Sequence, residues 1–254
     1  MLEINEHSFI KIQSLDSYQT ILLCYCYIYA DENEDIFMKF KRYNYKKKND
    51  QEMLEHSHNF MQLMLNRRSI RDFSSKEVPD KVIENILKTA ISSPSGANKQ
   101  PWSFVIVRSK GLKKKIRIAA EKEEKKFYSQ RASDEWLDDL NKFGTNWEKP
   151  FLEEAPALII IFRQSYDKRG SKKRKNYYVN ESVGIASGFL LTAIQNAGLV
   201  CLTHTPSPMG FLEQILKRPK NEKAYLLIPV GFPKKDAQVP VLSKKPYSES
   251  VKVL

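Results

Sequence analysis

The chain has 254 residues, of which 41% are hydrophobic and 28% are charged, and its formal net charge is +12. This length and composition exclude wholesale disorder and fit one α/β domain with an added terminal segment. The positive charge is compatible with nucleic acid, an acidic membrane surface or an anionic cofactor, and we do not expect nucleic acid as the partner. The three cysteines have neither a disulfide-framework nor a zinc spacing, which indicates a reducing compartment for the catalytic region.

The first 49 residues differ from the remainder, and we expect a leader, 1–49, ahead of a catalytic domain, 50–254. An apolar run, Ile21–Ala30, is followed by an acidic cluster and a basic stretch, Lys39–Lys48. As a helix the apolar run would rise about 15 Å, half of a ~30 Å hydrocarbon core, so a packed helix or a disordered leader is favoured over a membrane span. The localisation stays open between cytoplasmic and membrane-associated.

Helical patterns dominate the next part of the chain. A helix is predicted from Asp50, and a second helix after Pro79, which suits a first turn, with apolar residues at helical spacing as far as Ile91. The segment Ser93–Ala97 is predicted as a turn and Trp102–Val107 as a strand.

The middle of the chain alternates charged and apolar segments. A charged helix is predicted from Leu112 to about Tyr128, a charged aromatic stretch over Asp134–Trp147 and a buried strand over Ala157–Phe162. The basic stretch Lys168–Lys175 is predicted as a loop, leading into a long helix, Val179–Asn196.

Two strands, Leu199–Thr205 and Ala224–Val230, are predicted with a short helix, Gly210–Leu216, between them, and an extended tail from Ala237. The order of elements lacks the regular βαβ spacing of a doubly wound sheet, and the nine glycines form no Gly-x-Gly-x-x-Gly. Phosphate-loop, zinc-protease and nucleophile-elbow motifs are also absent from the sequence.

Three guanidinium groups, of Arg67, Arg68 and Arg71, fall within five residues, and Ser69 adds a hydroxyl. Guanidinium groups bind phosphate by two parallel hydrogen bonds, so one interpretation is a phosphate-bearing ligand. A chain with 42 Lys and Arg also produces such clusters by chance on a solvated face, so this cluster needs support from other features.

Further polar groups fall where elements end. The small residues of Ser93–Ala97 would let backbone amides approach a flat ligand, although alone they mark only a turn. Glu124 and Tyr128 are spaced i, i+4 on one helix face, where a carboxylate and a phenol converge, although as a lone pair they are better explained by surface chance. Thr203 and Thr205 stand at the end of a predicted strand.

Four segments together resemble the nitroreductase superfamily, and the stretch Glu121–Lys149 resembles the lid of its iodotyrosine deiodinase family. The segments are Arg67–Phe73, Pro94–Ala97 with Pro101 and Trp102, Gln195–Leu199, and Pro229–Pro233. The resemblance covers about 50–245 and implies an α+β fold: an α/β/α sandwich with a mixed central sheet, assembled as a domain-swapped homodimer.

The resemblance implies FMN as cofactor. It places the phosphate and ribityl chain on the arginine segment, the residues Ser95 and Gly96 against the flavin, Thr203 and His204 beside the ring, and the Thr205 hydroxyl on flavin N5, where it favours one-electron steps. Lys244 stands where the family has a tail arginine, so a point charge replaces a bidentate fork. The implied cofactor residues are Arg67, Arg68, Ser69, Ile70, Arg71, Ser95, Gly96, Thr203, His204, Thr205 and Lys244, with Thr205 also catalytic.

The lid trio matched by Glu124, Tyr128 and Lys149 suits an amino acid zwitterion, since Glu124 can pair with the ammonium, and Lys149 and Tyr128 with the carboxylate. By the resemblance, the amide of Ala97 meets the substrate phenolate. The expected reaction is reductive dehalogenation of mono- and diiodotyrosine with electrons from NADPH, directly or through a separate reductase. The alternative is a generic NAD(P)H-dependent reductase of nitroaromatics or quinones on the same fold.

Overall fold

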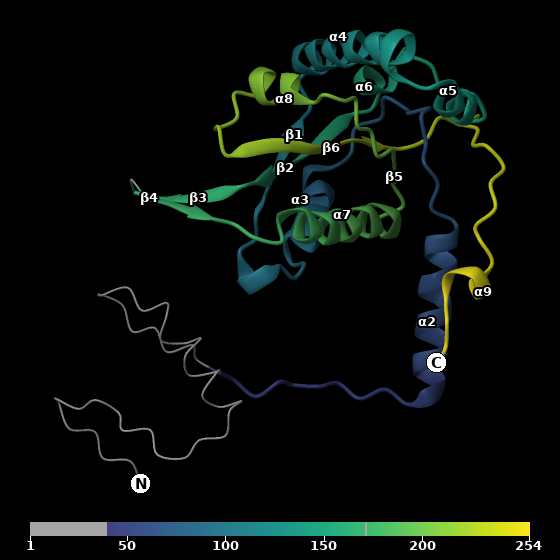
Figure 1. Cartoon of the computed structure of the whole chain (residues 1–254). Coiled ribbons are helices and arrows are strands. Elements are labelled where there is room, and N and C mark those ends of the chain that lie inside the picture. Colours follow the sequence, from purple (N-terminus) through teal and green to yellow (C-terminus); the bar gives the residue numbers. More distant parts are fainter. Residues whose placement is uncertain (1–39, 171) are drawn as a thin grey trace. The chain divides into compact units, whose positions relative to one another are not determined.

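The computed structural model describes residues 40–170 and 172–254 of the protein (Figure 1). The chain divides into two units, Met1–Asp50 and Gln51–Leu254. Residues 40–49 of the first unit are exposed and have no regular secondary structure, and the apolar run Ile21–Ala30 lies outside the described residues. In the part of the chain that the structure describes, no helix is both long and apolar enough to cross a membrane.

The second unit is built on a four-stranded antiparallel sheet in the order β1 (Trp102–Val107), β2 (Ala157–Gln164), β6 (Glu222–Gly231) and β5 (Val200–Cys201). The sheet was expected to be mixed, but a parallel relation is present only as an isolated bridge between Ser69 and Cys201 among the described residues.

Strand β5 is shorter than expected. A strand was predicted over Leu199–Thr205, but the ladder of β5 with β6 stops at Cys201. The Leu202 N–H still donates to the Pro229 carbonyl at 3.3 Å, but Pro229 has no N–H to donate in return. Pairing resumes only at His204, which forms an isolated bridge with Leu227.

Strand β2 lies at the centre of the core because both of its faces are apolar. Ala157, Ile159 and Ile161 pack into one hydrophobic cluster, and the alternate residues pack into another on the opposite face. This alternation follows from the two-residue period of a strand. A continuous apolar run therefore indicates a strand that is buried on both sides.

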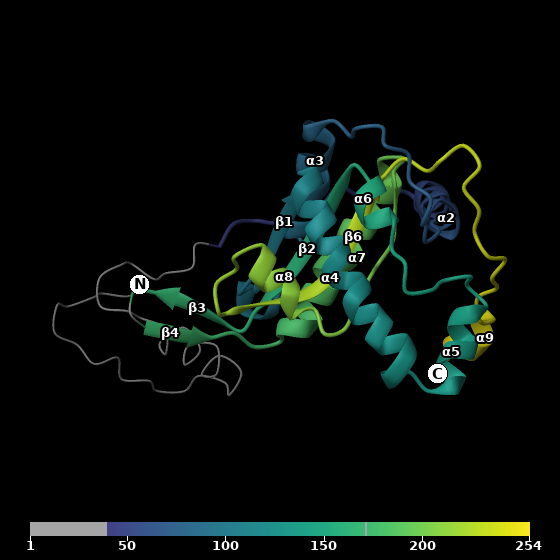
Figure 2. The same ribbon diagram turned by 90° about the horizontal axis from the view of Figure 1, so that it is seen from above.

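Helices cover both faces, which confirms the expected α/β/α sandwich (Figures 1 and 2). Helices α3 (Asp80–Ile91) and α7 (Val179–Asn196) pack on one face, and α4 (Lys110–Lys126), α6 (Phe151–Glu154) and α8 (Gly210–Ile215) on the other. Helix α7 ends where Gly198 adopts φ +72°, a conformation that favours glycine.

Helix α4 ends before Tyr128 and passes into a π-helical turn, Phe127–Arg131, which is followed by α5 (Asp134–Asn141). The Ser133 hydroxyl accepts from the Trp136 N–H and caps α5, so the charged aromatic stretch is partly helical. Tyr128 thus follows Glu124 on a widened turn instead of a regular α-helical one.

The basic stretch Lys168–Lys175, predicted as a loop, instead forms the end of the first strand and the whole second strand of a hairpin, β3 (Tyr166–Arg169) with β4 (Lys172–Lys175). Gly170 at φ +59° supplies the left-handed conformation that a tight hairpin turn requires. The run of Lys and Arg in the hairpin lacks the alternation of apolar and polar residues by which strands are recognised in a sequence. This explains why a loop was predicted.

Helix α2 (Asp50–Leu65) buries no residue, and the tail from Ala237 is irregular apart from α9 (Tyr247–Ser250). Helix α2 exposes several apolar side chains, namely Met53, Leu54, Phe60, Met61 and Leu65. One hydrogen bond, from Gln195 Nε2 to the Leu63 carbonyl, joins α2 to the end of α7.

Candidate active site

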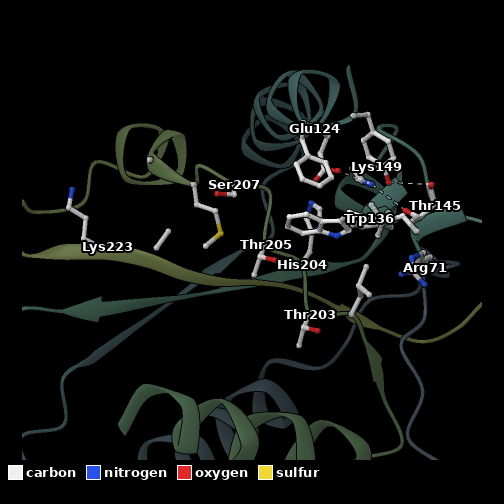
Figure 3. A pocket seen from close by; sticks show the side chains of 18 of the residues that line it. Arg71, Glu124, Trp136, Thr145, Lys149, Thr203, His204, Thr205, Ser207 and Lys223 are labelled. Carbon is white, nitrogen blue, oxygen red and sulfur yellow. Dashed lines mark hydrogen bonds and ion pairs between the residues drawn. The ribbon is translucent and has the colours of Figure 1, made fainter. Parts of the chain in front are cut away.

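A cavity lies between the α4–α5 lid and the face of the sheet that α4, α6 and α8 cover (Figure 3). Its volume of about 640 Å³ is within the usual range of small-molecule sites. Its wall combines three segments: the lid, the residues that follow β5, and the ends of β2 and β6. Seven residues expected at the site line it from these and the arginine segment: Arg71, Glu124, Tyr128, Lys149, Thr203, His204 and Thr205.

The two lid charges pair with each other. Lys149 Nζ lies 3.3 Å from Glu124 Oε2, and the side chains are only 4% and 13% exposed. Lys149 Nζ also donates to Thr145 Oγ1 at 3.3 Å and to the Asn146 carbonyl, while the Tyr128 hydroxyl donates to the Thr145 carbonyl at 3.3 Å. The trio is therefore assembled around the 145–149 loop.

Burial acts against the charged form of both partners. Desolvation raises the pKa of the Glu124 carboxyl and lowers the pKa of the Lys149 ammonium, and in each case the charge of the other residue opposes the shift. Two desolvated opposite charges form a site that a ligand carrying both an ammonium and a carboxylate can satisfy.

Glu121 positions Lys149, a role that sequence reasoning missed. One of its carboxylate oxygens, Oε1, accepts from the Lys149 main-chain N–H at 2.8 Å and from Arg117 Nε at 2.7 Å. Arg117 also reaches Glu153 at 3.6 Å. Glu121 stands one turn before Glu124, so α4 holds Lys149 by its backbone and by its ammonium; the i, i+3 spacing of the two carboxylates was the available signal.

The segment after β5 alternates its side chains like a strand. His204 exchanges main-chain hydrogen bonds with Leu227, at 2.9 and 3.0 Å, and its imidazole is buried edge-on to Phe151, with ring centroids 5.4 Å apart. Thr203 and Thr205 are exposed on the cavity wall. Within the described residues the Thr205 hydroxyl has no hydrogen-bond partner, so it is available to a ligand.

The His204 imidazole is held neutral. Burial, followed by the nearby positive charges of Lys149 and Arg71, lowers its pKa to about 3. Its Nε2 is buried without a hydrogen-bond partner among the described residues. An uncharged ring suits a position close to two cations.

The arginine segment runs beside β5, where the Ile70 N–H donates to the Cys201 carbonyl at 3.1 Å. Arg71 lines the cavity and is half-buried, and desolvation lowers the pKa of its guanidinium. Arg68 Nη2 donates to the Pro240 carbonyl, and neither Arg67 nor Arg68 lines the cavity. Ile70 is buried and does not line the cavity.

The turn at Ser95–Ala97 presents the main-chain amide of Ala97 without a partner in the described residues. Gly96 N–H donates to Ser182 Oγ at 3.4 Å, and the amides of Asn98, Lys99 and Gln100 donate to groups of Ser95 and Gly96. The Ala97 N–H has no partner within the described residues, and Ala97 adopts φ +46°. A Cβ on Gly96 would lie 2.7 Å from Tyr178 Cδ2, so this position needs glycine.

The single chain does not bring every expected site residue together. Ser95, Gly96 and Ala97 belong to the loop that precedes β1 and do not line the lid cavity. Lys244 lies exposed in the tail and also does not line the cavity. The lid trio, Arg71 and the residues after β5 are gathered by one chain.

Residues 64–232 match the sequence profile of the nitroreductase family, and the chain therefore belongs to the nitroreductase family. Within that family it is similar to iodotyrosine deiodinases. It is 58% identical over 196 residues to the iodotyrosine deiodinase of Haliscomenobacter hydrossis, a match covering 77% of this chain and 88% of that protein. It is 47% identical over 220 residues to that of Hydra vulgaris, covering 85% of this chain and 81% of that protein.

A solved structure agrees with these relatives. A crystal structure of oxidized iodotyrosine deiodinase bound to FMN and 3-iodo-L-tyrosine superposes with a TM-score of 0.64 at 32% identity. The superposition covers 74% of this chain and 96% of that chain.

Proposed function

We propose that the protein is an FMN-dependent reductive dehalogenase of mono- and diiodotyrosine. The observation that carries the proposal is the buried pair of Glu124 and Lys149 in a cavity that also holds Tyr128 and Thr205. A substrate ammonium would replace Lys149 at Glu124, and a substrate carboxylate would replace Glu124 at Lys149 and accept from the Tyr128 hydroxyl. Relatives named for the same reaction, at 47% to 58% identity, support the assignment.

The residues present fit FMN. Three guanidinium groups stand within five residues, and the Ala97 amide and the Thr205 hydroxyl are unpaired donors in the described structure. FMN when bound supplies the electrons of the reduction. Arg67, Arg68, Ser69 and Arg71 would hold its phosphate and ribityl chain, and Thr205 would donate to the ring.

The chain's own groups would orient the substrate for a balanced reaction. The carbon–iodine bond breaks and a carbon–hydrogen bond forms, with two electrons and one proton consumed and iodide released. We propose that the Ala97 amide holds the phenolate oxygen while the lid holds the amino acid end. The electrons would come ultimately from NADPH, directly or through a separate reductase.

We propose that the site is completed in a homodimer. The loop Ser95–Ala97 and Lys244 do not line the lid cavity of their own chain, so a partner copy would supply them. The bare helix α2 and the exposed tail residues Val241, Leu242 and Tyr247 present apolar surface that a second copy could bury. Analytical ultracentrifugation should give twice the mass of the chain.

Residues 50–254 would carry the catalysis, with 1–49 as a leader. A chain beginning at Asp50 should retain FMN binding and halotyrosine binding. Membrane fractionation of the full-length protein decides whether the leader associates with membranes.

The test of the proposed function is equilibrium binding of diiodotyrosine to the FMN-loaded protein, followed by flavin fluorescence. Submicromolar to micromolar binding, with tyramine analogues that lack the carboxylate bound at least about tenfold more weakly, supports it. Equal binding of nitroaromatic compounds and halotyrosines would favour the generic reductase instead.

A further inference from the structure

The hairpin β3–β4 is a basic arm that leaves the sheet and projects from the domain (Figures 1 and 2). Residues 166–175 include six basic residues and one acidic residue. The register sets Lys168 directly opposite Lys173, and both are exposed. Like charges opposite each other destabilise a strand pair, and neither lysine forms an ion pair within the described residues. An anionic partner would remove this repulsion.

The base of the arm is fixed by buried amides, so the charges are held in one direction. Asn176 Nδ2 donates to the Gln164 carbonyl at 3.1 Å and to Asp167 Oδ1 at 2.9 Å. Asn221 Nδ2 donates to the Tyr166 carbonyl at 2.8 Å. Pre-organised charge is what an electrostatic docking surface needs, because little ordering remains to be done on binding.

The positive charge continues from the arm to the rim of the candidate active site. Arg163 lies opposite Lys223 across β2 and β6, three residues before the hairpin begins, and both line the cavity. Lys223 lies at the opposite end of the cavity from Lys149 (Figure 3). Lys223 is paired with Glu213 at 2.6 Å and Arg163 is bonded to Asn180, so the charge without an ion pair in the described residues includes Lys168 and Lys173 of the arm.

We propose that the arm and this rim form a docking surface for an acidic redox protein that donates electrons. The inference rests on the proposed function, which consumes two electrons for each carbon–iodine bond broken; the donor is oxidised, and the proton comes from solvent. A basic surface at the mouth of a reduction site attracts a donor with an acidic face and orients it toward the cavity. Nucleic acid would meet the same charge but would bring no electrons, so we commit to the protein.

The test compares two double charge reversals in the full-length, FMN-loaded protein. Lys168→Glu with Lys173→Glu alters the arm, and Lys114→Glu with Lys115→Glu makes the same change of charge on exposed positions of α4. The probes are a reduced plant-type ferredoxin and a reduced flavodoxin, both acidic. Binding is measured by surface plasmon resonance at low and high salt, and flavin reduction by stopped flow.

The expected result is probe binding that weakens with salt, and a loss of about tenfold or more in affinity and reduction rate for the arm variant only. Reduction by dithionite and halotyrosine affinity should be unchanged in both variants. Failure of the unaltered protein to bind either probe, equal effects of the two reversals, or a loss of dithionite reduction in the arm variant would overturn the inference. A DNA oligonucleotide serves as a third probe. If the arm variant loses binding only to this oligonucleotide, the arm is a nucleic-acid site and the inference is overturned. Absence of tyrosine formation with dithionite in the unaltered protein would instead refute the proposed function.

Discussion

Lys149 Nζ lies 3.3 Å from Glu124 Oε2, and this ion pair is almost wholly withdrawn from solvent. The pair occupies the groups that a zwitterionic amino acid would use, so ligand binding must exchange one set of ion pairs for another. The exchange conserves charge only when the ligand carries both an ammonium and a carboxylate. The lid can therefore select substrates by their amino acid end, independently of the ring.

Lys149→Gln and Glu124→Gln should each weaken halotyrosine binding by about tenfold or more, because each leaves a buried charge without its partner. FMN affinity should stay within about twofold. Fluorescence titrations with diiodotyrosine and with FMN measure the two quantities. Lys142→Gln is the control, since Lys142 is an exposed lid residue paired with Asp139 at 2.7 Å. An equal loss of halotyrosine affinity and FMN affinity would contradict the assignment of these residues to substrate binding.

Glu121→Ala should weaken halotyrosine binding through Lys149, because it removes the acceptor of the Lys149 main-chain N–H. Glu121→Gln keeps a carbonyl acceptor and should recover much of the affinity, which a general structural defect would not permit. Hydrogen exchange at the Lys149 amide should speed up in the alanine variant alone. Unchanged exchange in the Glu121→Ala protein would contradict the positioning role.

His204 should make the protein acid-sensitive. Because burial lowers the pKa of His204 to about 3, the unfolded chain binds more protons than the folded chain between about pH 6.5 and 3. Stability is thus fully present above pH 6.5 and is lost as pH falls, by up to about 1.4 kcal/mol per pH unit.

His204→Asn should flatten this acid limb, and His56→Asn, at an exposed histidine of α2, should not. Urea unfolding at pH 7, 6, 5 and 4 measures the slopes. Identical slopes for the His204 variant and the unaltered protein would show that the imidazole is protonated freely in the folded state.

Gly96→Ala should lower the free energy of unfolding by about 1–3 kcal/mol, because its Cβ would lie 2.7 Å from Tyr178 Cδ2. Gly111→Ala, in the first turn of α4, meets only Ser109 Oγ at 3.9 Å and should raise the same quantity by up to about 1 kcal/mol. Urea denaturation of the pair checks both signs. Equal stability of the two variants would contradict the close packing of the turn on Tyr178.

Much of the fold could be predicted from local pattern. The helix from Asp50 and the strand Trp102–Val107 follow from their apolar periods, and the end of α7 follows from Gly198. The hairpin could not be predicted, because its strands carry charge on both faces. The end of β5 depended on Pro229 in a strand distant in sequence, which no local window contains.

Less of the candidate site could be predicted from residue patterns. Periodicity placed Glu124 near Tyr128, but only the family resemblance connected them to Lys149 across 21 residues. Glu121 was missed because its i, i+3 spacing to Glu124 is an ordinary feature of a highly charged helix and does not by itself mark a positioning residue. The roles of Ser95, Gly96, Ala97 and Lys244 stay predictions that depend on a second copy of the chain.

The most direct test of the central claim is anaerobic incubation of the purified, FMN-loaded protein with dithionite and diiodotyrosine, following tyrosine and iodide by chromatography. The account predicts FMN-dependent formation of tyrosine with stoichiometric iodide, and none in a control without FMN. A bound, reducible flavin that leaves diiodotyrosine intact would contradict it and point to a generic reductase.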